Sequence, residues 1–207
     1  MDNVESRTAG RPRAFEPEDA VAAALDTFWG RGFSEVSVTD LEGSTGIIRT
    51  SLYNAFGNKR GLFDAALDYY LTDLSGEIDR RLTSATGGLT DIHQFFDYLE
   101  SMFIASSRGC FMVNAMIEFG DTDPTITQRA NDYIETIAAG FRAALSRAQA
   151  NDEIPPTPPI GTTANQLVLE TRGLNLAVRI GPDPDRLHSL FEAAHHTVRT
   201  LQPTADR

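Results

Sequence analysis

The chain of 207 residues contains one cysteine and one lysine. A single cysteine cannot form a disulfide within the chain, which fits a reducing cytoplasm. No run of about 18 or more apolar residues occurs, so no membrane span is expected. The N-terminal stretch MDNVESRTAGRPRAFEPEDA also lacks the apolar segment of a secretory signal peptide. We therefore expect a cytoplasmic protein with no membrane partner.

Motifs of catalysis and metal binding are missing as well. The sequence holds no Walker loop, no Gly-x-Ser-x-Gly, no Cys-x-x-Cys and no His-Glu-x-x-His. The adjacent pair His195–His196 points to different faces of a helix, and we interpret it as surface or dimer-interface residues. We expect no metal, no cofactor and no enzymatic activity. A small helical enzyme acting on an apolar substrate is kept as a competing class.

The negative charge of the chain is distributed unevenly. The net charge is −11, which by itself argues against a nucleic-acid partner. Residues 1–60 carry a net charge of −2, whereas residues 61–207 carry −9. Apart from Arg31, the cations of the first part lie in the N-terminal arm and in the segment 49–60. A basic face can therefore form from these two segments.

Helical periodicity covers most of the chain, and signals for β-strands are scarce. Apolar residues recur at three- and four-residue spacing in segments such as 17–31, 59–82 and 183–201. No stretch alternates apolar and polar residues with β-branched enrichment. The pattern predicts an all-α fold of about nine helices with no sheet.

Capping residues predict where several of these helices begin. Residues 37–40 read SVTD and match a capping box, in which side chains satisfy free amides of the first helical turn. Asn58 is placed to cap the long helix over residues 59–82. Thr90 or Asp91 is expected to cap the helix that follows.

Two short helices joined by a glycine-bearing turn, early in an all-helical chain, indicate a helix-turn-helix. The first follows the SVTD box, and the second runs from about Ile48 to Phe56. The stretch FSEVSVTDLEGSTGIIRTSLYNAFGNKRGLF resembles the DNA-binding segment of TetR-type transcriptional regulators. The resemblance covers roughly residues 14–64. It rests on Phe33, Ser37, Asp40-Leu41, Gly46, Leu52-Tyr53, Phe56, Gly57-Asn58-Lys59 and Leu62-Phe63.

This resemblance implies a three-helix DNA-binding domain followed by a larger helical domain that dimerises and usually holds a ligand. We accordingly divide the chain into a flexible N-terminal arm (1–13), a helix-turn-helix domain (14–60) and a ligand-binding and dimerisation domain (61–207). From the arm, Arg11 and Arg13 would reach a neighbouring groove of the DNA. The residues predicted to contact double-stranded DNA are Ser37, Arg49, Thr50, Ser51, Tyr53, Asn54, Lys59, Arg11 and Arg13.

Within the second short helix, Arg49 and Thr50 would face base edges, where an arginine can hold a guanine through two hydrogen bonds. Tyr53, Asn54 and Lys59 would lie nearer the phosphates, whose contacts set register without reading sequence. Plainer interpretations stand beside these. Arg49 would then be a solvated side chain, Tyr53 a half-buried packing residue and Lys59 part of a charged turn.

Two positions depart from the usual pattern of the family. Glu42 stands where a small residue is usual, and Ile48 stands where Ser, Thr or Asn is usual. Ile48 cannot cap the recognition helix as a hydroxyl would, but its side chain can read a thymine methyl group. Glu42 is expected to add an acidic group near DNA and to weaken binding.

The segment SSRGCFMVNAMIEFG resembles a Gly-Cys subgroup of the TetR-type regulators that includes the N-ethylmaleimide-responsive repressor. Cys110 would begin a helix, two residues after Arg108, and both features favour a thiolate. The resemblance therefore raises the hypothesis that Cys110 senses electrophiles or oxidants. The alternative is a small buried residue in a tight helix crossing, as free cysteines usually are.

The apolar helices of the second part are expected to line a pocket for a small-molecule inducer, with Glu118 as a further polar anchor. Core packing is the competing interpretation for each residue of the pocket. The candidate ligand-binding residues are Phe95, Leu99, Met102, Phe103, Cys110, Asn114, Met116, Phe119 and Tyr133.

By resemblance, the last two helices form the homodimer interface, and two-fold symmetry implies a pseudo-palindromic operator. The leading hypothesis is a DNA-binding transcriptional regulator, a repressor released from its operator by a small apolar ligand. A repressor that senses electrophiles or oxidants through Cys110 is the alternative. A helical protein-interaction module, which would show no salt-dependent DNA binding, is a further class.

Overall fold

The computed structural model describes residues 15–120, 122–181 and 183–203, and over these ranges it contains helices and no strands. The all-α prediction with nine helices is confirmed for these ranges. None of the described helices combines the length and hydropathy that a membrane span requires. The helices are α1 (Pro17–Arg31), α2 (Val38–Thr45), α3 (Arg49–Phe56), α4 (Lys59–Ile78), α5 (Leu89–Ala105), α6 (Phe111–Phe119), α7 (Pro124–Ala150), α8 (Ile160–Arg179) and α9 (Pro184–Arg199), with a π-helical turn η1 (Asp79–Thr83) after α4.

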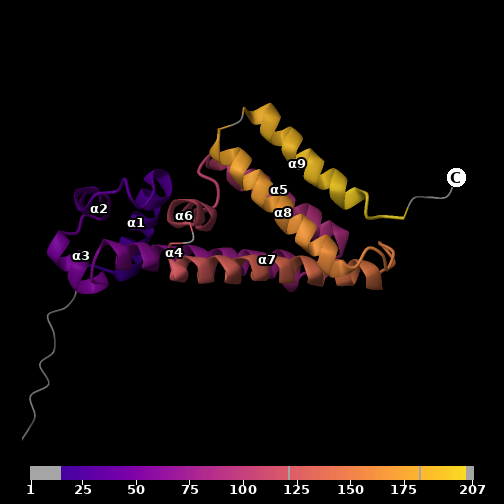
Figure 1. The fold of residues 1–207 in the computed structure, drawn as a ribbon, viewed down its shortest axis with the longest axis horizontal. Helices are drawn as coiled ribbons and strands as arrows, with labels where there is room; N and C mark the ends of the chain where they lie inside the picture. The colour runs from indigo at the N-terminus through magenta and orange to yellow at the C-terminus, as the bar shows by residue number, and fades with distance from the viewer. Residues whose placement is uncertain (1–14, 121, 182, 204–207) are drawn as a thin grey trace, which may run out of the picture.

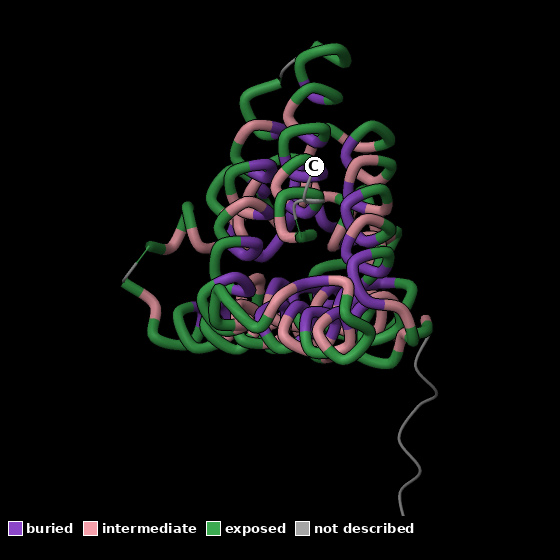
Figure 2. Tube along the Cα trace, turned by 90° about the vertical axis from the view of Figure 1, so that its right-hand side faces the viewer, coloured by how far each residue is buried: buried purple, intermediate pink, exposed green. Residues whose placement is uncertain are grey.

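Figure 1 shows α1, α2 and α3 gathered at one end of an elongated molecule. The long helix α4 leaves this end and runs beside α7, while α5 and α8 cross obliquely above them. Helix α9 is the outermost element and packs on α5 and α8. Figure 2 shows the buried residues on the inward sides of the helices, as expected of amphipathic helices that share one core.

An aromatic cluster connects the first three helices to the rest of the molecule. Its centre is Phe63 of α4, whose ring lies 5.2 Å from the rings of Phe28 and Phe33. On its other side, Phe63 lies 5.4 Å from the rings of Phe111 and Phe119 on α6. Edge-on and tilted contacts at these distances add to the stabilisation that burial alone provides.

The structure confirms two of the predicted caps and contradicts one. The hydroxyl of Ser37 accepts a hydrogen bond from the amide of Asp40 in a capping box. The side chain of Asn58 accepts a hydrogen bond from the amide of Gly61. Helix α5 begins with Gly88 at its N-cap, so the expected cap by Thr90 or Asp91 is wrong.

The carboxylate of Glu153 supplies the missing cap of α5 from a distant loop. It accepts the amide of Leu89 at 2.9 Å. A side chain at position 88 would lie 2.5 Å from Glu153 and 2.7 Å from the backbone of Ala148, so only glycine fits there. Asp91 is instead buried, and its carboxylate pairs with Arg147 at 3.0 Å.

Histidines connect α9 to α5. The Nδ1 atoms of His93 and His195 lie 2.8 Å apart, and the Nε2 atom of His195 lies 3.2 Å from the Asp97 carboxylate. His195 is buried, which contradicts a surface position, whereas His196 is exposed. The alternative expectation, a position in the dimer interface, stays a prediction. Only one proton fits between the two Nδ1 atoms, so one of the rings must present a lone pair there.

This geometry makes the stability of the α5–α9 contact dependent on pH. Burial, His195 and Arg199 lower the pKa of His93, against smaller opposing effects of Asp97 and Glu192. Below pH 6.5, His93 therefore binds a proton more readily in the unfolded chain than in the folded chain. As a result, the free energy of unfolding falls as the pH falls through this window.

We expect the wild type to lose more stability between pH 7.5 and pH 5.5 than a His93→Gln variant, measured as the free energy of unfolding in urea. His188 is the matched control, because Glu100 raises the pKa of that exposed histidine. A His188→Gln variant should lose more stability on acidification than the wild type, the opposite sign. Equal pH slopes for the wild type and His93→Gln would contradict this prediction.

Candidate nucleic-acid interface

The two short helices α2 and α3 are held against α1 and α4 by their buried apolar residues. Val36, Leu41 and Leu52 are almost completely buried. Gly46 adopts the left-handed conformation, with φ of 68°, which reverses the chain between the two helices. Helix α3 has eight residues, and Leu52 is buried beneath it, so its opposite face is open to solvent.

The start of α3 has a cap that no local pattern indicates. Ile48 occupies the N-cap position without a side-chain hydrogen bond, as expected, and its side chain is 67% exposed. The amide of Arg49 donates instead to Oε1 of Glu42 on α2, at 2.6 Å. The two unusual residues thus complement each other. The carboxylate of Glu42 therefore caps the helix, while its expected weakening of DNA binding stays a prediction.

Two cations of this region lie over aromatic rings. The guanidinium of Arg49 is 5.1 Å from the centre of the Tyr53 ring, and the ammonium of Lys59 is 4.3 Å from the centre of the Phe33 ring. These contacts hold the charges in place while leaving them able to donate hydrogen bonds. A third cation, Arg60, lies 5.0 Å from the centre of the Phe119 ring, but it also forms ion pairs with Asp64 and Asp123.

The residues predicted to contact DNA differ in their surroundings. Arg49, Thr50 and Asn54 are exposed on α3, whereas Ser51, Tyr53 and Lys59 are half-buried around it. Ser37 lies apart at the start of α2, with its hydroxyl engaged in the capping box. Arg11 and Arg13, with the predicted arm of residues 1–13, lie outside the described residues.

Glu118 of α6 attaches the segment between α1 and α2 to the rest of the molecule. Its two carboxylate oxygens accept the amides of Phe33 at 2.8 Å and Ser34 at 2.6 Å. Gly32 has φ of 87°, and a side chain there would lie 3.0 Å from the same carboxylate. The contact therefore depends on a glycine at the end of α1.

A second attachment joins α1 to the turn before α6. The indole nitrogen of Trp29 donates to the carbonyl of Gly109 at 3.0 Å. Arg108 lies over the Trp29 ring at 4.5 Å and pairs with Asp26 at 2.9 Å. The guanidinium expected to favour a Cys110 thiolate is thus engaged with α1.

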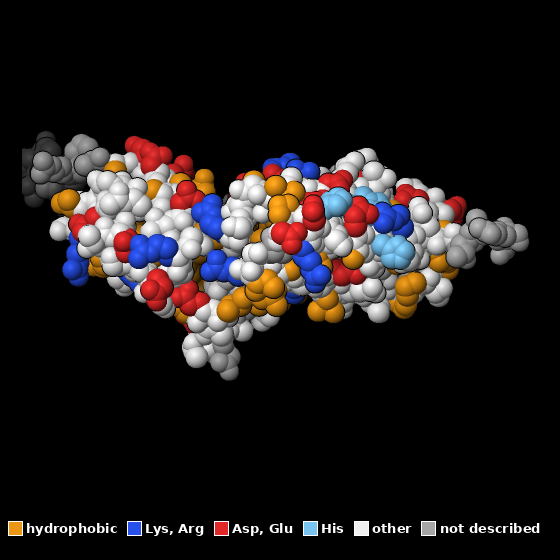
Figure 3. All heavy atoms as spheres, turned by 90° about the horizontal axis from the view of Figure 1, so that it is seen from above, with side chains coloured by type: hydrophobic (Ala, Val, Ile, Leu, Met, Phe, Trp, Pro, Cys, Tyr) orange, Lys and Arg blue, Asp and Glu red, His pale blue; other side chains and the backbone are white. Residues whose placement is uncertain are grey.

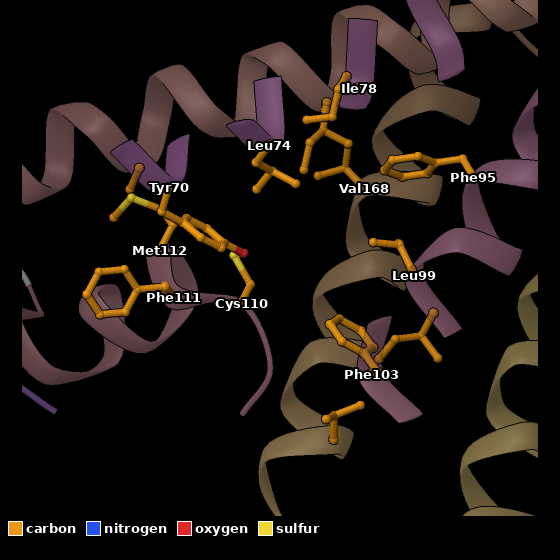
Figure 4. Packing of buried hydrophobic residues seen from close by; sticks show 14 of the residues in the cluster. Tyr70, Leu74, Ile78, Phe95, Leu99, Phe103, Cys110, Phe111, Met112 and Val168 are labelled. Atoms are coloured by element: carbon orange, nitrogen blue, oxygen red, sulfur yellow. The ribbon is translucent and has the colours of Figure 1, made fainter. Parts of the chain in front are cut away.

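Among the described residues, the predicted ligand-binding residues are divided between the core and separate cavities. Phe95, Leu99, Phe103 and Cys110 are buried in the core, as Figure 4 shows. Phe103 borders a cavity of about 130 Å³. Asn114 lines a separate cleft of about 250 Å³ between α1 and α6. The other candidates, Met102, Met116, Phe119 and Tyr133, are half-buried and pack against the core.

Cys110 occupies the N-cap of α6 and is only 2% exposed. Its amide donates to the side chain of Asn175 at 2.6 Å, and its sulfur lies 3.6 Å from the hydroxyl of Tyr133. Figure 4 shows the sulfur beside the hydroxyl end of Tyr70. That hydroxyl is buried without a hydrogen-bond partner among the described residues. Burial raises the pKa of both tyrosines, which keeps their hydroxyls protonated.

Comparison with known families agrees with this arrangement. The family described as "Bacterial regulatory proteins, tetR family" matches residues 20–66, which include α2 and α3. The family described as "Tetracyclin repressor-like, C-terminal domain" matches residues 88–200, more than half of the chain. The chain belongs to the TetR family.

Individual TetR-type relatives support the same assignment. The chain is 29% identical to the HTH-type transcriptional repressor ComR of Escherichia coli over 203 residues, which cover 93% of this chain and 92% of ComR. It is 48% identical to the repressor BdcR of E. coli over 67 residues, 32% of this chain and 34% of BdcR. The chain is therefore a DNA-binding transcriptional regulator of the TetR type.

Solved TetR-family structures share the fold. A cysteine mutant of the regulator CifR, complexed with a 26-base-pair operator DNA, has a TM-score of 0.79 and 26% identity, covering 90% of this chain and 98% of that chain. The reduced form of E. coli NemR has a TM-score of 0.75 and 19% identity, covering 91% and 97%. The latter similarity concerns the fold alone.

The cap of α3 by Glu42 gives a testable prediction about this TetR-type helix-turn-helix. Glu42→Ala should lower the free energy of unfolding by about 1 kcal/mol, because the amide of Arg49 loses its acceptor. Adding Ile48→Ser to that variant should restore about the same amount, since serine caps the helix from its own position. Urea denaturation of the single and double variants measures both changes. Glu35→Ala, at an exposed glutamate ahead of α2, is the control and should be nearly neutral. No recovery by Ile48→Ser would show that the Glu42 effect is not capping.

Proposed function

We propose that the protein is a repressor that binds a two-fold symmetric operator as a homodimer, with α3 of each subunit in the major groove. The observation that carries this proposal is the solvent-facing side of α3, which presents Arg49, Thr50 and Asn54 beside Tyr53 and Lys59. The similarity to the repressors ComR and BdcR and to the operator-bound CifR supports it.

In this proposal the residues at the start of α3 read bases. Ile48 offers an apolar surface for a thymine methyl group, and Arg49 offers paired donors for guanine, with Thr50 beside it. Tyr53, Asn54 and Lys59 hold phosphates.

The domain division and the arm complete the DNA-binding part of the proposal. Residues 14–60 form the DNA-binding domain and residues 61–207 the regulatory one, with α4 continuous across the boundary. Ser37 and Ser51 contribute at the edge of the interface. Arg11 and Arg13 bind a neighbouring groove from the arm of residues 1–13.

The dimer forms through α8 and α9. Helix α8 exposes three large apolar side chains: Leu169 at 69%, Leu176 at 55% and Ile180 at 79%. Residues seven and four apart lie on one side of a helix, so the three form a continuous apolar stripe. Exposed apolar surface of this kind marks interfaces between proteins. A two-fold axis there places both α3 helices on one side of the dimer.

A small ligand bound in the regulatory part releases the repressor by favouring a conformation that binds DNA less well. Helix α4 is the mechanical link in this proposal, because it starts at Lys59 beside α3 and ends in the core at Ile78. The aromatic cluster around Phe63 supports this coupling. Phe63 of α4 packs against two aromatic rings of α6, so a shift of α6 displaces α4 as well.

DNase footprinting and binding assays at several salt concentrations test the DNA contacts. We expect a two-fold symmetric footprint in the DNA upstream of the gene. Lys59→Gln should weaken binding and reduce the salt dependence by about one ion per subunit, because one phosphate contact is lost. Tyr53→Phe should weaken binding similarly across sequences without changing the salt slope.

Arg80→Gln is the control, because Arg80 is an exposed arginine of η1, beyond the far end of α4, and pairs with Glu77. It should leave binding unchanged. Unchanged affinity in both Lys59→Gln and Tyr53→Phe would contradict the contact assignments. The absence of any salt-dependent DNA binding by the wild type would favour the interaction-module class over the repressor.

Release through Cys110 is a second candidate function. The observation that supports it is the position of the sulfur at the N-terminus of α6, 3.6 Å from the hydroxyl of Tyr133. Modification of a thiol that is only 2% exposed would displace its neighbours and disturb the contact of α6 with α4.

The rate of alkylation tests this candidate. A buried, inert thiol reacts with iodoacetamide in the folded protein far more slowly than in urea, and that result would count against the sensor function. If the sensor function holds, N-ethylmaleimide releases the wild type from its operator and leaves Cys110→Ser bound. Release of both proteins, or of neither, would rule the sensor function out.

A further inference from the structure

The cleft between α1 and α6 lies where the DNA-binding part meets the regulatory part. Its volume is about 250 Å³. Figure 3 shows the hollow between the two parts, with Lys and Arg side chains along its edge. The walls come from four helices: α1, α4, α6 and the C-terminal end of α8. Of the four aromatic residues in the lining, Trp29 is half-buried, whereas Phe28, Phe63 and Phe111 are at most 2% exposed.

The size of the cleft limits what can occupy it. Sites for drug-sized ligands have volumes of about 300–1,000 Å³, so a cleft slightly below this range suits a molecule with a single ring. Aromatic side chains bind another ring through stacked or edge-on contacts. The walls therefore favour a planar, aromatic occupant.

The polar groups at the cleft favour an anion. Arg31 and Arg179 line it, but Arg31 pairs with Asp40 at 2.7 Å. Arg108, whose guanidinium lies over the Trp29 ring, likewise pairs with Asp26. Arg179 forms no ion pair among the described residues. The acidic residue of the lining, Glu118, directs both oxygens to the amides of the α1–α2 segment. A carboxylate is therefore attracted by Arg179, whereas a cationic occupant is repelled by it.

Asn114 provides a further donor. Its side-chain nitrogen gives one hydrogen bond to the carbonyl of Arg108 at 2.8 Å. An amide nitrogen carries two N–H groups, so a second one remains for a ligand oxygen. Arg179 is exposed at the last turn of α8, where its guanidinium can form two parallel hydrogen bonds with a carboxylate.

We propose that this cleft binds a single-ring aromatic carboxylate, with its ring against Trp29 and Phe111 and its carboxylate on Arg179 and Asn114. The role of this cleft as the inducer site rests on the proposed repressor function. Because the cleft touches α1 and α6 at once, an occupant there changes how the DNA-binding part sits on the regulatory part. Binding itself requires neither DNA nor the dimer.

Isothermal titration calorimetry of the full chain with sodium benzoate tests the site. The wild type should bind benzoate saturably, and benzylamine, with the opposite charge, should not bind. Arg179→Gln should weaken benzoate binding about tenfold, as loss of a charge-assisted contact does. Ala115→Leu, which fills the cleft from a buried position on α6, should abolish it. Arg80→Gln should bind as the wild type does.

Several results would overturn the proposal. They are the absence of saturable benzoate binding, equal binding of benzylamine, or unchanged benzoate affinity in Arg179→Gln. Because Arg179 is exposed, that variant is informative even if Ala115→Leu fails to fold. Operator binding measured without benzoate tests the repressor function separately, so the failure of one proposal is distinguishable from the failure of the other.

Discussion

The packing of Phe63 is the interaction on which the rest of the structure depends. This one side chain contacts aromatic rings from α1, from the α1–α2 segment and from α6. It lies one turn after Lys59, at the start of the helix that runs through both parts of the molecule. The DNA-binding part therefore has no separate core of its own. A displacement of α6 must alter the packing around Phe63 and therefore that of α1 and the α1–α2 segment.

Polar contacts around this cluster fix the orientation that the aromatic packing allows. Trp29 donates a hydrogen bond to the carbonyl of Gly109, and Glu118 accepts hydrogen bonds from the amides of Phe33 and Ser34. Apolar contacts alone are tolerant of small rotations, whereas hydrogen bonds require defined distances and angles. The combination explains how an acidic chain holds a few cations, Lys59 among them, at defined places. General basicity is not needed when each donor is positioned by its neighbours.

Much of the fold could be predicted from the sequence because its signals are local. Apolar spacing predicts the helices, and Ser37 and Asn58 predict two of their starts, since a cap acts within four residues. The end of α4 was less predictable: the helix stops at Ile78 and continues as a π-helical turn. There, Gly140 of α7 packs closely on Ile78 and Leu82, a contact between residues far apart in the sequence.

The sequence by itself determined the helical class, the helix-turn-helix and the family, because these follow from residue type and spacing. Only the tertiary structure decided the roles of residues whose partners are distant. It assigned Glu42 to the cap that Ile48 cannot provide and Glu153 to the start of α5. It also buried His195 against His93 and opened a cleft at Asn114 and Glu118, whose lining includes none of the apolar residues predicted for the pocket. The physical reason is that a carboxylate, an imidazole or a cavity wall acts through whichever groups folding brings within a few ångströms, and sequence spacing does not record that distance.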